Sequence, residues 1–139
     1  MLGRMSVSQS APSSVAARVE DSVFAVQKRV SIEPRIGVVL GSGLGGFADT
    51  LQDAVKIPYR DLPHMPSSAV PGHEGNLCFG RVAGVPVVCM QGRVHLYEGH
   101  GVDKVVHGVR TMARLGVRAM LAGTAANLMS AAIVGILLP

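Results

Sequence analysis

Several residue types that define particular protein classes are scarce in this 139-residue chain. Tryptophan is absent, aromatic residues make up 4%, and the two cysteines, Cys78 and Cys89, stand in separate apolar runs. Two cysteines at this spacing supply neither a disulfide scaffold nor a zinc site. We therefore expect both thiols to be free and buried, as in a protein of a reducing compartment.

Charge is also sparse, because only 16% of the residues are charged and no run of Lys or Arg occurs. A basic stripe with interleaved aromatic residues is missing, which excludes a nucleic-acid-binding surface. The net charge is nevertheless +4, and ten of the thirteen basic residues are Arg. Arginine favours bidentate contact with phosphate or carboxylate. The charge pattern therefore indicates a small anionic substrate.

The two ends of the chain differ from its middle. Residues 1–19 are rich in Ser and Ala, lack acids and lack the apolar stretch of a secretory signal, so we expect a disordered leader at 1–14, with a transit peptide as the alternative. The last 21 residues carry no charge, and that length could span a membrane. Polar residues dilute this stretch and no basic flank follows it, so we expect no membrane span. A membrane anchor remains an alternative.

Hydrophobic periodicity predicts one domain in which helices and strands alternate. Helices are expected at 15–30, 47–51 and 103–115, and strands at 35–40, 55–59, 76–82, 85–91 and 117–122. The strands at 76–82 and 85–91 read as a hairpin connected around Gly84–Pro86. Residues 61–75 hold three prolines and are expected to form a long loop. The pattern is typical of an α/β layered fold.

A glycine loop follows the first predicted strand, at residues 41–46. Such a loop brings backbone N–H groups close to an anion, and Ser42 adds a hydroxyl suited to a small phosphate. The spacing also fits GxGxxG, but the acid of that dinucleotide fingerprint would have to be Asp61, beside the proline-rich loop. Phosphate binding is the preferred interpretation. A dinucleotide module and a purely structural turn remain alternatives.

A polar segment follows the strand at 85–91 and contains Arg93, His95, Tyr97 and Glu98. In an extended segment, residues two apart share a face, which would aim the first three into one site. A fixed cation, an imidazole that titrates near neutral pH and a phenol suit a phosphate beside a sugar. The alternative is a solvated polar loop.

Five histidines are present, and one of them is held between glycine turns. His73 lies in the segment Pro71–Gly75, where turn geometry would keep it accessible; the alternative is an ordinary surface histidine. His64, His100 and His107 are expected to be surface or loop residues. The histidine spacings match no metal-binding pattern, so we expect no metal site.

Taken together, these segments resemble the trimeric purine nucleoside phosphorylases. The resemblance rests on five pieces in the right order: Gly41–Gly45, Val70–Gly75, Met90–Gly99, Val109–Met112 and Leu115–Val117. It implies a mixed β-sheet flanked by helices. The methylthioadenosine phosphorylases share that fold and are the nearer alternative within the family.

The resemblance also implies roles for individual residues. Ser42, His73, Arg93, His95 and the backbone amide of Ala125 would surround phosphate. Tyr97 would pack on the ribose, and Glu98 would support the phosphate site by hydrogen bonding, with His95 and Glu98 counted as catalytic.

The implied reaction is phosphorolysis of a purine nucleoside to free base and (deoxy)ribose 1-phosphate, without a metal or organic cofactor. The partners would be phosphate and nucleoside, the oligomer a homotrimer and the location the cytoplasm.

The resemblance covers residues 15–126, and the apolar tail at 127–139 does not match it. Members of the family are about twice as long, and the half that this chain lacks recognises the purine. We therefore expect a truncated phosphorylase domain with no more than trace activity. A non-catalytic fragment that keeps its anion site is the alternative.

Overall fold

The computed structural model describes residues 14–41, 43–67, 75–117 and 119–122. These residues form an α/β fold whose single sheet has the strand order β2-β3-β4-β1-β5. The strands are β1 (Ile36–Leu40), β2 (Gln52–Pro58), β3 (Asn76–Val82), β4 (Val85–Gln91) and β5 (Ala119–Ala122). β1 is parallel to β4 and β5, whereas β2, β3 and β4 are antiparallel. The predicted mixed sheet is therefore confirmed.

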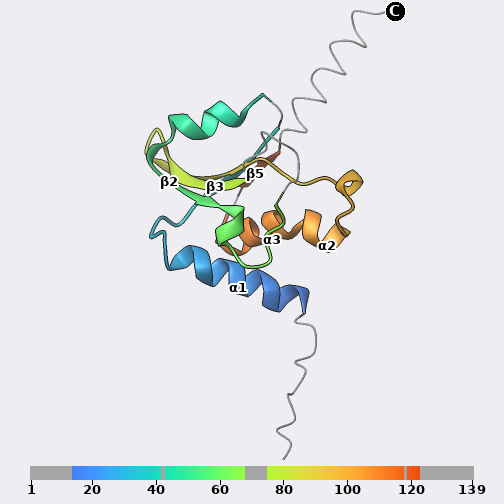
Figure 1. Ribbon diagram of the computed structural model, residues 1–139. Helices are drawn as coiled ribbons and strands as arrows, with labels where there is room; N and C mark the ends of the chain where they lie inside the picture. The colour runs from blue at the N-terminus through green and yellow to red at the C-terminus, as the bar shows by residue number, and fades with distance from the viewer. Residues whose placement is uncertain (1–13, 42, 68–74, 118, 123–139) are drawn as a thin grey trace, which may run out of the picture.

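Helices cover both faces of the sheet (Figure 1). α1 (Val15–Gln27) and α3 (His107–Arg114) lie side by side on one face, with α2 (Val102–Val105) leading into α3. The short helix η1 (Gly45–Thr50) covers the other face. Two further 3-10 turns, η2 (Tyr59–Asp61) and η3 (Leu96–Glu98), follow β2 and β4.

The sheet separates the core into two clusters, one on each face. Successive side chains of β3 and β4 point to opposite faces and so enter the two clusters alternately. Leu77, Phe79 and Val88 belong to the cluster beneath α1 and α3. Cys78 and Cys89 belong to the cluster beneath η1. β3 and β4 are therefore buried on both faces, which explains why these two strands read as nearly continuous apolar runs.

The hairpin turn and the helix expected at 103–115 differ from their predicted forms. The hairpin turn lies at Ala83 and Gly84, where φ is +48° and +79°, and not around Gly84–Pro86. Positive φ at both central residues is the geometry that matches the right-handed twist of the flanking strands. The expected helix at 103–115 is divided into α2 and α3 at Val106 (φ −89°, ψ −2°).

The break at Val106 changes which residues α3 buries. His107, Gly108, Thr111 and Met112 are buried, whereas the valines expected to form the apolar face are only partly buried. Gly108 permits this approach, because a Cβ there would lie 2.6 Å from Met90 Cε. The expectation that His107 lies at the surface is thus wrong.

His107 can be buried because its side chain and its backbone carbonyl both form hydrogen bonds. Ser22 Oγ on α1 donates to Pro63 O at 2.6 Å, so its oxygen accepts from His107 Nε2 at 2.8 Å. Thr111 Oγ1 in turn donates to His107 O at 2.9 Å. This network joins α1, α3 and the loop after η2.

The buried imidazole predicts an acid-sensitive fold. Burial, with smaller effects from the charges of His64, Arg18 and Arg110, lowers the pKa of His107 below its usual value. His107 is therefore protonated near pH 6.5 in the unfolded chain but only at a lower pH in the folded chain. Its contribution to the free energy of unfolding is present above pH 6.5 and is lost as the pH falls below that value. We expect the free energy of unfolding, measured in urea, to be smaller at pH 5.5 than at pH 8. His107→Gln should flatten this dependence.

His100→Gln, in the loop after η3, is the matched control and should keep the wild-type pH dependence. An unchanged slope in the His107 variant would refute the assignment.

Candidate functional site

The strand ends bring the predicted polar segments to one edge of the sheet. β1 ends at Leu40, which pairs with Gln91 at the end of the parallel strand β4. β3 runs the opposite way and begins there, because Asn76 also pairs with Gln91. The glycine loop and the segment after β4 therefore leave the sheet side by side, at the edge where ligands bind in open α/β sheets.

The glycine loop turns directly from β1 into η1. Leu44 N donates to Gly41 O at 3.1 Å, and Gly43 has a φ of +82°, which favours glycine. A Cβ built at Gly41, Gly43 or Gly46 would meet no described atom within 4 Å. None of the described residues therefore covers these three positions, which favours the binding interpretation over a purely packed turn.

The segment after β4 bends at Gly92 (φ +91°), is extended at His95 (φ −118°, ψ 155°) and then forms η3. The expectation that alternation along an extended strand aligns Arg93, His95 and Tyr97 is therefore wrong beyond His95. The rings of His95 and Tyr97 nevertheless come together by stacking, with centroids 4.8 Å apart and planes at 10°. Tyr97 is 81% exposed, so its ring is available to a ligand.

Glu98 stabilises the turn that places His95. Its Oε1 accepts from His95 N at 2.9 Å, and Glu98 N donates to His95 O at 3.1 Å. Arg93 is exposed and forms no ion pair with any other described residue. Its guanidinium is therefore open to an external anion. Ser42, His73 and Ala125, the other expected phosphate contacts, lie outside the described residues.

Tyr59 is a residue of this edge that the sequence did not single out. Its side chain is 3% exposed; its hydroxyl donates to Gly92 O at 2.7 Å and its N–H to Gly75 O at 2.9 Å. Burial, and to a smaller degree Cys78, raises the pKa of Tyr59 above its usual value, so the hydroxyl stays a neutral donor. Tyr59 thereby ties the start of the segment after β4 to the residue before β3.

Gln91 is the second residue that the sequence did not single out. Its Nε2 donates to Gly45 O at 2.9 Å, and its Oε1 accepts from Asn76 Nδ2 at 3.1 Å. One side chain therefore connects the ends of β4 and β3 with the glycine loop. Hairpin register would have revealed the Asn76–Gln91 pair had the turn been placed at Ala83–Gly84.

The predicted state of the cysteines is confirmed, because Cys78 and Cys89 are free and buried. They lie opposite each other on β3 and β4. Burial raises the pKa of each thiol to about 11, so both are protonated at neutral pH. Neither is activated as a nucleophile.

The sheet topology argues against the dinucleotide alternative. That fingerprint requires an acid at the end of a strand parallel and adjacent to the first. β1 has β4 and β5 as its neighbours, and β2 lies at the far edge. Asp61 sits in η2, where its carboxylate pairs with Arg29 at 3.6 Å.

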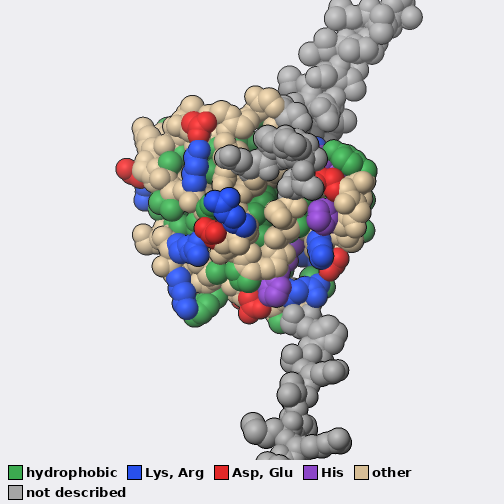
Figure 2. All heavy atoms as spheres, in the orientation of Figure 1, with side chains coloured by type: hydrophobic (Ala, Val, Ile, Leu, Met, Phe, Trp, Pro, Cys, Tyr) green, Lys and Arg blue, Asp and Glu red, His purple; other side chains and the backbone are tan. Residues whose placement is uncertain are grey.

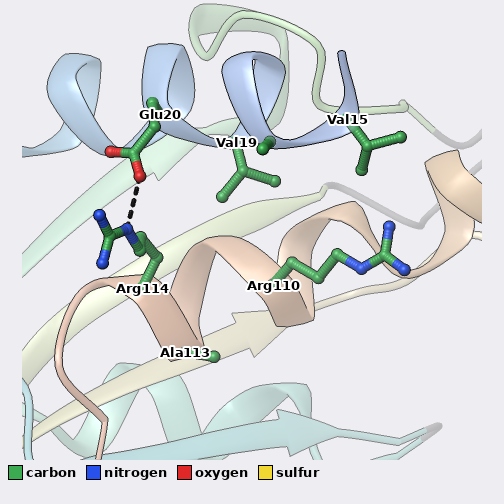
Figure 3. Close-up of a pocket in the computed structure, with 7 residues that line it drawn as sticks. Val15, Val19, Glu20, Arg110, Ala113 and Arg114 are labelled. Atoms are coloured by element: carbon green, nitrogen blue, oxygen red, sulfur yellow. Dashed lines mark hydrogen bonds and ion pairs between the residues drawn. The ribbon is translucent and has the colours of Figure 1, made fainter.

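A separate surface cleft of about 680 Å³ lies between α1 and α3 (Figure 3). Val15 and Val19 supply apolar walls, and Glu20 pairs with Arg114 across the cleft. It contains none of the strand-end residues described above. On the face shown in Figure 2, basic side chains are interspersed with acidic, apolar and uncharged ones.

Two further searches concern only the described part of the chain. Within it, no three His, Cys, Asp or Glu side chains gather as metal ligands. None of its helices combines the length and apolar character that crossing a membrane requires.

Comparison with known proteins agrees with this geometry. A purine nucleoside phosphorylase of Geobacillus stearothermophilus is 45% identical over 109 residues, which cover 78% of this chain and 40% of that protein. A purine nucleoside phosphorylase of Bacillus subtilis is 44% identical over 110 residues, or 79% and 41% of the two chains. The chain thus spans about two-fifths of the length of these relatives.

Solved structures of the same kind superpose on the fold. The purine nucleoside phosphorylase of Schistosoma mansoni in complex with acetate has a TM-score of 0.71 at 45% identity, covering 76% of this chain and 39% of that one. The model of the phosphorylase superfamily matches residues 35–133, a range that includes the glycine loop and the whole segment after β4. The chain therefore belongs to the phosphorylase superfamily.

Proposed function

We propose that this protein functions in the phosphate-dependent cleavage of purine nucleosides, and that the chain supplies the phosphate and ribose side of the site. The observation that carries the proposal is that the glycine loop and the segment containing Arg93, His95 and Tyr97 leave the sheet at the same edge. Relatives of known structure support the choice of substrate, since they were solved in complexes with ribose-1-phosphate and with inosine.

Each residue of the proposed site has a role that its chemistry permits. Arg93 and the loop amides bind phosphate, together with Ser42, His73 and the amide of Ala125. His95 donates to phosphate or ribose, and Tyr97 packs against the ribose ring. Glu98 holds the backbone of His95 through the bond described above. His95 and Glu98 are thus assigned to catalysis.

The proposed reaction needs positioning and charge more than an activated side chain. A phosphate oxygen attacks the anomeric carbon, the bond to the purine nitrogen breaks, and ribose 1-phosphate and free base form. The transition state carries positive charge on the sugar, which the bound phosphate dianion stabilises electrostatically. Holding phosphate and sugar together supplies much of the remaining acceleration. The reaction requires no metal or organic cofactor.

Related proposals follow from the same assignment. We place the protein in the cytoplasm, where nucleosides and phosphate are both available, and expect a homotrimer. We divide the chain into a leader (1–14), the phosphorylase portion (15–126) and an apolar tail (127–139). A second candidate function is anion binding without catalysis, for which the exposed Arg93 guanidinium after β4 would suffice.

Release of hypoxanthine from inosine, followed with xanthine oxidase, tests the proposed function. We expect a phosphate-dependent rate at least tenfold below that of the Bacillus subtilis relative, because base recognition lies outside the assigned residues. Each 1.4 kcal/mol of lost transition-state binding costs about tenfold in rate. A rate within tenfold of that enzyme would contradict the expected impairment.

Binding experiments separate the two candidate functions. Ribose 1-phosphate should compete with phosphate more strongly than ribose 5-phosphate does if the site is built for the phosphorolysis product. Equal competition by the two sugars, without hypoxanthine release, would favour simple anion binding. Phosphate-independent release of hypoxanthine would overturn phosphorolysis.

A further inference from the structure

The side chain of Gln91 is held in one orientation by three contacts. Nε2 donates to Gly45 O at 2.9 Å, while Oε1 accepts from Asn76 Nδ2 at 3.1 Å and from Cys78 Sγ at 3.6 Å. A carbonyl oxygen can only accept, so the amide nitrogen must face Gly45. Reversing the amide would place two oxygens together at one end and two N–H donors together at the other.

The hydrogen bond from Gln91 to Gly45 holds the proposed phosphate loop against the end of β4. Gly45 begins η1 and lies within the glycine loop, between Gly43 and Gly46, two positions where a Cβ would meet no described atom within 4 Å. A bond between Gln91 and Gly45 therefore fixes this part of the loop to the end of β4, two residues before Arg93. The positions of the glycine loop and of the segment after β4 therefore both depend on Gln91.

We propose that Gln91 is a positioning residue that preorganises the glycine loop for an oxyanion. This inference rests on the proposed phosphate site and adds to it a residue that touches no substrate. Without this hydrogen bond, phosphate binding would have to order the loop, and the conformational entropy lost in doing so would lower the affinity for phosphate. The Cys78 thiol, protonated at neutral pH, is the second donor to Gln91 Oε1, beside Asn76 Nδ2.

The test compares Gln91→Met with Gln27→Met. Methionine preserves the length and unbranched form of the side chain but removes the amide group, with both its oxygen acceptor and its N–H donors. Gln27 is exposed at the end of α1, on the far side of the sheet from η1, so the same chemical change there serves as the control. For both variants, phosphate affinity is measured by titration calorimetry, and thermal stability by circular dichroism.

We expect Gln91→Met to weaken phosphate binding about three- to tenfold at a temperature where the chain is folded, the loss typical of one hydrogen bond. Gln27→Met should bind as the wild type does. A lower melting temperature with unchanged affinity would mean a merely structural role and would overturn the proposal.

A second readout does not depend on phosphate. Amide hydrogen exchange of Leu44 and Phe47, whose N–H groups close the two turns of the loop, should be faster in Gln91→Met than in the control. Unchanged exchange would overturn the positioning role even if affinity fell. If the wild type fails to bind phosphate, the proposed function fails, and exchange alone decides whether Gln91 orders the loop.

Discussion

Replacing Arg93 with alanine is expected to weaken phosphate binding roughly hundredfold. Hydrogen bonds to charged groups each contribute about 1.5–3 kcal/mol, and about 1.4 kcal/mol corresponds to a factor of ten in affinity. The Arg93 guanidinium is exposed two residues after the end of β4 and forms no ion pair within the described chain, so binding an anion would not break an existing pair. Titration calorimetry with phosphate and with sulfate measures the loss.

Arg81→Ala is the matched control for that experiment. Arg81 donates to Gly84 O at the hairpin turn, on the opposite edge of the sheet, and its removal changes the net charge by the same amount. It should leave phosphate affinity within about twofold, because exposed charges farther apart than the Debye length of ~8–10 Å are largely screened. Equal affinities of wild type and the Arg93 variant would remove Arg93 from the site.

Phe79→Ala is expected to produce the largest loss of stability, about 3–5 kcal/mol. Phe79 is fully buried on β3, in the cluster between the sheet and the helices α1 and α3. The truncation leaves a cavity that the surrounding strands can only partly fill. Since domains of this size are stable by about 5–15 kcal/mol, much of the chain's stability would be lost. Denaturant unfolding followed by circular dichroism measures the change.

Val82→Ala provides the comparison on the same strand. Val82 is 39% exposed at the hairpin end of β3, and surface substitutions usually change stability by less than about 0.5 kcal/mol. A Phe79 variant within about 1 kcal/mol of the wild type would show that this cluster contributes less than typical core packing does.

Local patterns predicted most of the elements because each pattern reflects the surface that an element buries. The valines of α1 recur at helical spacing because one face packs on the sheet, and the apolar runs of β3 and β4 reflect burial on both faces. The glycine loop was predicted where it occurs because glycine is chosen for backbone conformations such as that of Gly43.

The failures have two causes, a contact distant in sequence in one case and the local geometry of a turn in the others. Polar character suggested a surface position for His107, but Ser22, 85 residues away, supplies its hydrogen-bond partner. The extended pattern after β4 gave way to η3, because Glu98 bonds back to the His95 backbone. Placing the hairpin turn too late along the chain also concealed the pairing of Asn76 with Gln91.

The sequence by itself determined the residue chemistry of this protein: an open glycine loop, an Arg and His segment after an apolar strand, and two buried thiols. Those features depend on residue type and short-range spacing, which sequence records directly. Only the tertiary structure decided that the loop and the segment leave the same sheet edge, since this follows from the parallel pairing of β1 with β4. It also decided that Tyr59 and Gln91 hold that edge together, because hydrogen bonds across 33 and 46 residues follow from strand order.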